Sequence, residues 1–117
     1  TVSAIPFGTA GYSQNIPAIA VVVGKLESYF SPRDRHAIYV DSSLAAMQFM
    51  LGLETLGLSS SVINWPDFEP LERKMQKTLG LDLTDRVVML IAFGYAHPEG
   101  LVPFSQKKEL DTFRRYN

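Results

Sequence analysis

The stretch LETLGLSSSVINWPDFEP, from Leu53 to Pro70, separates two helical patterns and decides how the chain can fold. The first pattern runs into Gly57, a residue type that readily takes the left-handed conformation that ends a helix. Asp67 offers N-cap chemistry for the second pattern. Between them, the residues SSSVINW are too apolar for a surface loop. We therefore expect a short strand over residues 59–64 between two helices.

The pattern before Gly57 predicts a helix with few polar side chains. The residues at 41–43, Asp-Ser-Ser, can accept hydrogen bonds from the backbone N–H groups of a first helical turn. Over residues 44–56, the clearly polar residues are Gln48, Glu54 and Thr55. A helix without a wide polar face is normally buried, and a chain of 117 residues cannot easily surround one. We expect this helix to pack against a second subunit; the alternative is that its cover lies in sequence outside this chain.

Two continuous apolar runs predict strands that are buried on both faces. PAIAVVVGKLE, residues 17–27, is rich in β-branched residues and is entered through a proline. RVVMLIAFGYA, residues 86–96, gives the strongest strand signal in the chain. Residues 28–40 between the first strand and the first helix are expected to form a loop, because Pro32 and alternating charges interrupt them.

The second helix shows an amphipathic pattern. Its apolar stripe consists of Leu71, Met75 and Leu79, Pro70 falls in its first turn, and Gly80 ends it. The predicted order is strand, helix, short strand, helix, strand and a tail, which is a layered structure with helices covering a small sheet. The first sixteen residues show little periodic signal, which is typical both of a natural domain start and of a fragment of a longer polypeptide.

Composition excludes several classes of protein. The net charge is −1 and no block of like charges occurs, so no nucleic-acid partner is predicted. The absence of cysteine excludes disulfides and cysteine-ligated metals. The longest apolar runs are too short to span a bilayer, so no membrane partner is predicted. We expect a soluble, cytoplasmic protein.

No motif in the sequence identifies catalytic chemistry on the protein's own side chains. There is no nucleophile elbow, phosphate-binding loop or dinucleotide fingerprint. His36 and His97 have no partner at a metal-ligand spacing, so no metal site is predicted. We interpret His36 as a loop or interface residue, whereas His97 follows a strand and can also lie on the substrate side. If the protein is an enzyme, a cofactor must perform the difficult step.

Four stretches, taken in order, resemble the C-terminal half of the nitroreductase family of FMN-dependent oxidoreductases. They are PAIAVVVGK, YVDSSLAAMQFMLGLETLGLSSSVINW, LGLDLTDRVVMLIAFGYAHP and SQKKELDTFRRYN. The most specific part is the segment 41–65 followed by Phe93-Gly94-Tyr95. The resemblance implies an α+β fold, with a mixed sheet flanked by helices and a long apolar helix at a homodimer interface that holds FMN. It further implies that NAD(P)H reduces FMN, which passes electrons to nitroaromatics, quinones or similar small-molecule acceptors.

The resemblance also assigns cofactor-binding residues and no catalytic side chain. The segment that lies along the flavin ring in the family corresponds to Val62, Ile63, Asn64 and Trp65. A backbone N–H at about Asn64 would donate to flavin N5. Lys107 and, second, Lys108 correspond to a basic motif that reaches the FMN phosphate. The alternative interpretation is a plain core strand with Trp65 as a packing residue, and a solvated lysine pair.

Two motifs from the family's N-terminal half, an arginine-rich phosphate motif and a Pro-Ser loop, have no counterpart in this sequence. We therefore expect residues 1–117 to be a single domain that is the C-terminal part of a longer nitroreductase-like chain. The competing hypothesis is a dimeric binding or assembly domain without catalysis, built on the same half of the fold.

Overall fold

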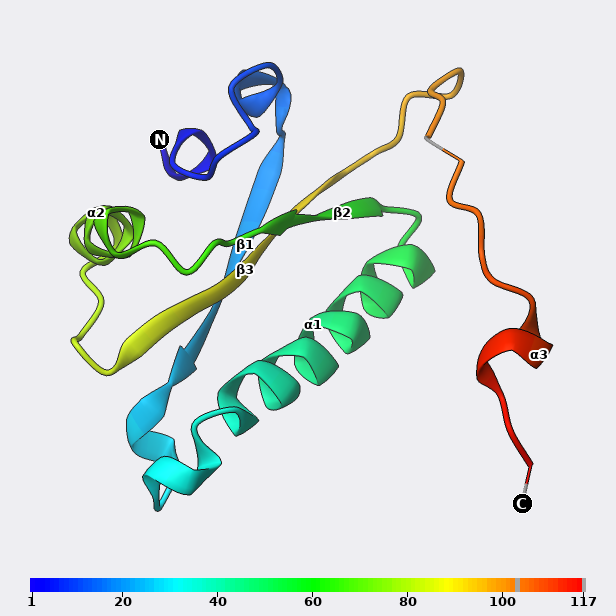
Figure 1. Ribbon diagram of the computed structural model, residues 1–117. Helices are drawn as coiled ribbons and strands as arrows, with labels where there is room; N and C mark the ends of the chain where they lie inside the picture. Colours follow the sequence, from blue (N-terminus) through cyan, green and yellow to red (C-terminus); the bar gives the residue numbers. More distant parts are fainter. Residues whose placement is uncertain (103, 117) are drawn as a thin grey trace.

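Three antiparallel strands and their flanking helices form an α+β fold in the computed structural model, which describes residues 1–102 and 104–116 (Figure 1). The strands are β1 (Ala18–Lys25), β2 (Ser59–Asn64) and β3 (Asp85–Gly94). The helices are α1 (Ala37–Thr55), α2 (Glu69–Leu79) and the short α3 (Leu110–Phe113). Single 3-10 turns lie at Val2–Ala4, Ser13–Asn15, Leu26–Ser28 and Pro32–Asp34. The predicted strand over residues 59–64 is confirmed with the same bounds.

The sheet has the order β1-β3-β2, and both outer strands run antiparallel to β3. The prediction of a mixed sheet is therefore wrong for the described residues. The reason is that α1 connects β1 to β2, which runs in the same direction as β1 but is not its neighbour in the sheet. The last strand, β3, lies between them and runs in the opposite direction, so the two strands that run in the same direction do not pair with each other.

A β-bulge in β3 determines which of its side chains face α2. Val22 pairs with Met89 and Val23 pairs with Val87, so Val88 is an extra residue with no partner on β1. Side chains otherwise alternate between the two faces of a strand. The bulge shifts this alternation, and as a result Val87 and Leu90 both enter the same core cluster although they are three residues apart.

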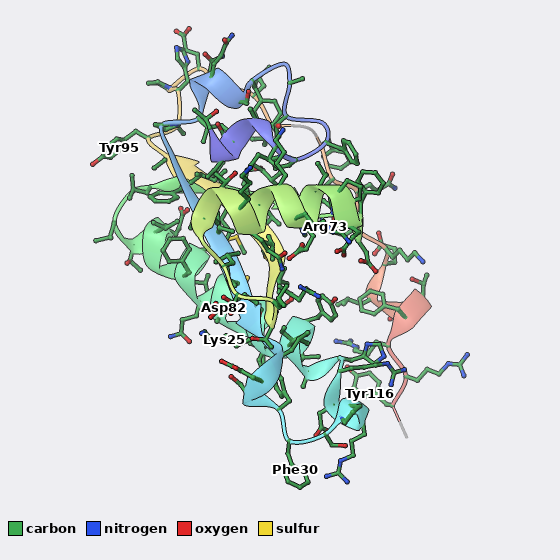
Figure 2. The ribbon with its side chains drawn as sticks, turned by 90° about the vertical axis from the view of Figure 1, so that its left-hand side faces the viewer. Lys25, Phe30, Arg73, Asp82, Tyr95 and Tyr116 are labelled. Atoms are coloured by element: carbon green, nitrogen blue, oxygen red, sulfur yellow. The ribbon has the colours of Figure 1, made fainter. Side chains whose placement is uncertain are left out.

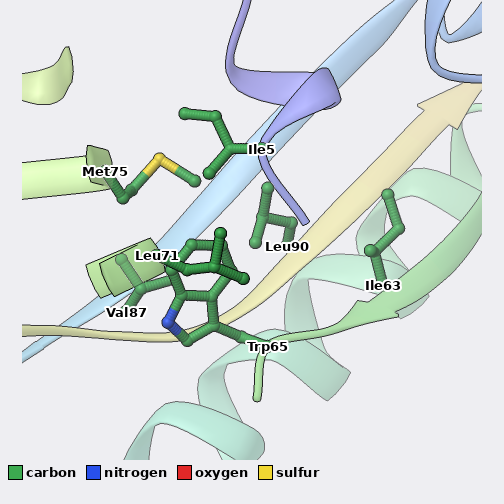
Figure 3. Packing of buried hydrophobic residues seen from close by; sticks show 7 residues of the cluster. All are labelled: Ile5, Ile63, Trp65, Leu71, Met75, Val87 and Leu90. Atoms are coloured by element: carbon green, nitrogen blue, oxygen red, sulfur yellow. The ribbon is translucent and has the colours of Figure 1, made fainter. Parts of the chain in front are cut away.

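The main core cluster lies between the sheet and α2 (Figure 3). Its buried members are Ile5, Ile63, Trp65, Leu71, Met75, Val87 and Leu90. Ile5 comes from the N-terminal segment, which shows little periodic signal in the sequence. Ile5 is the one aliphatic residue that is buried between the two 3-10 turns, so it leaves no periodic apolar pattern, and its contacts in the core cluster identify it as a core residue.

The opposite face of the sheet packs against α1. Phe49 of α1 meets Phe93 of β3 edge to face, with ring centroids 5.7 Å apart. Gly24 of β1 lies so close to Ile38 of α1 that a Cβ atom at this position would overlap the Ile38 side chain. Ile38 is fully buried, so the absence of a side chain at Gly24 sets the distance between α1 and the sheet.

The first helix begins at Ala37, and the prediction of an N-cap over Asp41–Ser43 is wrong. Asp41 lies inside the helix, where its carboxylate accepts a hydrogen bond of 2.9 Å from the hydroxyl of Tyr29. Desolvation and, next, this hydrogen bond raise the pKa of Tyr29 above its ordinary value. The predicted loop over residues 28–40 is correspondingly wrong at its end, because residues 37–40 are helical.

The second helix differs from its prediction at its first turn. It begins at Glu69 with Phe68 at the N-cap position, so Asp67 is not the cap. Pro70 does lie in the first turn, and Gly80 ends the helix in the left-handed conformation with φ of 68°. Leu71 and Met75 are buried as the apolar stripe predicts, whereas Leu79 is exposed.

Burial on both faces applies to β3 but not to β1. Leu90 and Ile91 are successive residues of β3 on opposite faces, and both are 0% exposed. Most of β1 is half-buried instead, because it is an edge strand of the described sheet. Beyond β3 the tail is exposed, with α3 as its single short helix in the described range. No helix among the described residues is long and apolar enough to cross a membrane.

Replacing Gly24 with alanine tests the close contact between β1 and α1. The added methyl group meets the buried, β-branched Ile38, which has no free space to move into. We expect Gly24→Ala to lower the free energy of unfolding by about 1–3 kcal/mol, measured by urea unfolding followed with circular dichroism. Gly11→Ala is the control, since nothing lies within 4 Å of its added Cβ. Equal stability of the two variants would contradict this account of the interface.

Candidate functional site

Side chains in the segment predicted to lie along a flavin, residues 62–65, alternate between the surface and the core. Val62 and Asn64 are exposed, whereas Ile63 and Trp65 are buried in the core cluster. β2 is also an edge strand of the described sheet. Half of the backbone N–H and C=O groups of such a strand face away from its neighbour and are open to other partners. The segment therefore combines a fixed inner side with an accessible outer edge.

Trp65 is held in the core by a buried carboxylate on α2. Its indole Nε1 donates to Oε2 of Glu72 over 2.7 Å, and the backbone N–H of Val87 donates to Oε1 over 3.1 Å. Both oxygens of the buried Glu72 thus have a partner, and one side chain ties α2, the end of β2 and β3 together. For the Trp65 side chain, the alternative interpretation as a packing residue agrees with the structure (Figure 3).

Lys107 and Lys108 lie in the exposed tail beyond β3. The ammonium of Lys107 donates to the hydroxyl of Ser105 over 2.6 Å, a local contact within the tail. Beyond β3 the tail extends away from the sheet (Figure 1). The structure therefore does not bring the two lysines together with the β2 segment.

A surface hollow of about 290 Å³ lies where β2 begins and β3 ends; we call it the strand-end hollow. Three segments line it: Tyr12 with Asn15–Pro17, Ser59–Ser61, and Ala92–Ala96. Tyr95 stands at its rim, is 84% exposed and projects from the molecule (Figure 2). Tyr12, Asn15 and Ile16 lie outside the stretches that resemble the family; the other lining residues lie within them, but none of the lining was predicted as a site residue. The signal that identifies them is the strand register, which pairs Ser59 with Gly94 and Ser61 with Ala92.

The outer face of α1 exposes three apolar side chains at helical spacing. Leu44, Met47 and Leu51 are 67%, 51% and 56% exposed. Together with Gln48, Gly52 and Thr55 they line a shallow depression of about 440 Å³, which we call the α1 groove. An exposed apolar surface of this kind is typical of an interaction site.

Several other polar and charged residues make structural contacts. The ammonium of Lys25 lies 3.7 Å from the carboxylate of the buried Asp85, and this pair joins the end of β1 to the start of β3. The backbone N–H of Asp82 donates to the other oxygen of Asp85 over 2.9 Å. Nδ1 of His97 accepts from the backbone of Glu99, which is a local loop contact. In the described part of the chain, no cluster of three or more His, Cys, Asp or Glu residues could hold a metal ion.

Solved structures from bacteria share this arrangement of strands and helices. An FMN-dependent nitroreductase of Clostridium difficile matches with a TM-score of 0.76 and 19% identity, over 99% of this chain and 67% of that one. A Clostridium acetobutylicum protein, provisionally assigned as an NADH oxidase, matches with a TM-score of 0.74 and 15% identity, over 97% and 65%. A nitroreductase family protein of Streptococcus pneumoniae matches with a TM-score of 0.61 and 24% identity, over 77% and 42%. At these identities the likeness shows the fold.

The sequence supplies the family. Residues 10–95 match the sequence model of the nitroreductase family, so the chain belongs to that family, as its motifs predicted. No match was found among curated proteins. The chain spans about two thirds or less of the length of the solved structures that it matches, 65% and 67% for the two clostridial proteins.

Replacing Glu72 with glutamine tests the buried link to Trp65. Both oxygens of Glu72 accept hydrogen bonds, so an amide NH₂ group would face a donor and leave it unpaired. We expect Glu72→Gln to lower the free energy of unfolding by about 1–3 kcal/mol. Glu69→Gln makes the same chemical change on the exposed face of α2, where it breaks only an ion pair with Arg73, and should cost less than about 1 kcal/mol. If urea unfolding gives equal losses for the two variants, the buried link contributes nothing beyond a surface charge.

Proposed function

We propose that the protein is an FMN-dependent oxidoreductase of the nitroreductase type. It takes electrons from NAD(P)H and passes them through the flavin to nitroaromatics, quinones or similar small-molecule acceptors. The family match over residues 10–95 is the observation that carries this proposal. The likeness of the fold to a protein described as an FMN-dependent nitroreductase supports it. The cytoplasmic location expected from the sequence is part of the same proposal.

The chemistry of the β2 edge fits the ring of a flavin. Val62 offers an exposed apolar surface and Asn64 an exposed amide next to the open backbone edge of β2. A flavin is flat and largely apolar, with polar atoms along its rim, so a strand edge with this composition can accept both parts. When bound, FMN supplies the hydride and electron transfer that no side chain of the chain can perform.

The residues of the β2 segment divide their roles in this proposal. The backbone N–H at about Asn64 would donate to flavin N5, because a fixed backbone donor stabilises charge and does not titrate. The side chains of Ile63 and Trp65 are buried in the core, so we assign them main-chain contacts with the cofactor and a positioning role. Through Glu72, Trp65 holds this part of the chain against α2 and β3.

Lys107 and Lys108 are proposed to hold the FMN phosphate. Both are exposed and lie in the tail beyond β3, outside any helix or strand. A lysine binds phosphate as a point charge on a long stem and does not need the fixed fork geometry of arginine. This mode of binding suits a segment that is not part of a regular element.

We further propose that the α1 groove is the interface with a second copy of the chain. Leu44, Met47 and Leu51 follow one another along one face of the helix and are more than half exposed. A homodimer would remove this apolar surface from water, at roughly 25 cal/mol per Å² of buried area. A long helix that is apolar on nearly every side is not shown, so the proposed interface rests on this one apolar face of α1.

Flavin retention and turnover test the proposed function. The chain, and the product of the complete reading frame that contains it, are refolded or expressed with FMN and desalted. We expect a bound flavin absorbance and oxidation of NADH or NADPH that depends on an added nitroaromatic or quinone. A dimer that binds no flavin and shows no turnover would overturn the proposal and support the assembly role without catalysis.

Substitution of Lys107 tests the proposed phosphate contact. Loss of one charge-assisted contact of about 1.5 kcal/mol weakens binding roughly tenfold. We therefore expect Lys107→Ala to raise the Kd for FMN about tenfold while affecting riboflavin, which lacks the phosphate, little. Lys74→Ala removes an exposed lysine of α2 and serves as the control. An equal change of the Kd for FMN and for riboflavin would show that Lys107 does not contact the phosphate.

Substitution of Leu51 tests the α1 groove as the dimer interface. Leu51→Glu places a charge in the middle of the proposed apolar contact, where burial without a partner is costly. We expect a dimer for the unsubstituted chain and a monomer for Leu51→Glu in light scattering after size-exclusion chromatography. Thr78→Glu on exposed α2 is the control and should remain dimeric. A dimeric Leu51→Glu variant would exclude this interface.

A further inference from the structure

The strand-end hollow exists because small residues face one another across β2 and β3. Ile63 is paired with Leu90, and both are buried in the core cluster. On the same face, the next two pairs are Ser61 with Ala92 and Ser59 with Gly94. The large side chains of the core therefore stop, and the sheet continues with a floor of small ones.

The N-terminal segment forms the opposite wall of the hollow. Pro17 packs so closely on Gly94 that a Cβ atom at Gly94 would overlap the proline ring. Tyr12, Asn15 and Ile16 extend this wall beyond the proline, and Tyr95 stands at the rim. The hollow thus lies where three segments that are far apart in the sequence come together.

The lining defines the chemistry of a ligand. None of the twelve lining residues carries a charge, and among them are aromatic rings, three serine hydroxyls and one amide. The lining offers an ionised ligand no opposite charge, whereas the rings and hydroxyl groups can contact a neutral aromatic ligand. The volume of about 290 Å³ is at the lower end of the roughly 300–1,000 Å³ range of small-molecule sites. We propose that the strand-end hollow binds a neutral aromatic molecule of one or two rings that carries a hydrogen-bonding oxygen.

This site is separate from the residues assigned to the flavin. None of Val62–Trp65, Lys107 or Lys108 lines the hollow. Two of the hollow's β2 residues, Ser59 and Ser61, share the face of β2 that carries Ile63, whereas the third, Ser60, shares the other face with Val62 and Asn64. The inference therefore does not rest on the proposed function, and a redox-inert ligand can test it in the absence of FMN.

The test compares two ligands that share a ring system and differ in charge. Uniformly ¹⁵N-labelled chain is titrated at pH 7 with 2-naphthol, which is neutral, and with 2-naphthoate, which is an anion. We expect saturable shifts of the amide signals of Ser59–Ser61 and Gly94–Ala96 with 2-naphthol, and binding of 2-naphthoate weaker by about tenfold or more. Equal affinity for both ligands, or shifts that cluster elsewhere in the chain, would overturn the proposal.

Two variants locate the binding. Ser61→Leu fills the floor of the hollow and should abolish saturable binding of 2-naphthol, whereas Ser28→Leu, an exposed serine at the other end of β1, should leave it unchanged. Tyr95→Ala removes an exposed wall residue and cannot disturb the core, so it tests the site even if Ser61→Leu fails to fold. We expect it to weaken binding several-fold. A folded Ser61→Leu variant, or a Tyr95→Ala variant, that binds 2-naphthol with the original affinity would contradict the assignment.

Discussion

The pairing of β3 with a strand on each of its edges is the constraint on which the rest of this structure depends. β1 and β2 do not touch each other through backbone hydrogen bonds, so the sheet exists only because β3 lies between them. Two successive residues of β3, Leu90 and Ile91, are completely buried on its opposite faces. The α2 core and the packing of α1 are thus connected through one strand, and the bulge at Val88 sets which residues each face receives.

The end of a helix could be predicted from the sequence where a residue at that end determines it. Gly57 and Gly80 both have positive φ, as expected for glycines that end helices. β2 was predicted because its apolar residues follow three serines directly after a helix end. The start of α1 could not be predicted in this way, because a carboxylate that can cap a helix can also accept a bond from a distant donor. Asp41 does the latter with Tyr29, and nothing near Asp41 in the sequence reveals it.

For the candidate site, the sequence supplied the family and the segment but not the orientation of its side chains. The alternation of side chains along a strand implies that Ile63 and Trp65 share one face of β2. That this face is the buried one follows from contacts with distant residues, namely packing in the cluster with Leu90 and the hydrogen bond from Trp65 to Glu72. The strand-end hollow depends on a register between segments more than thirty residues apart, which no local pattern contains. The family could be predicted because the resemblance rests on the order of several weak motifs, and the family match over residues 10–95 agrees with it.

Trp65 is the only tryptophan in the chain, and its surroundings give it a consequence beyond packing. Its indole is shielded from water in the core and donates to a carboxylate, while its neighbour Asn64 lies on the open edge of β2. The tryptophan fluorescence of the protein, excited selectively at wavelengths that tyrosine does not absorb, therefore originates from one position, next to the segment assigned to the cofactor. Its emission wavelength and intensity report in a single signal whether the end of β2 is held in place, without an introduced label.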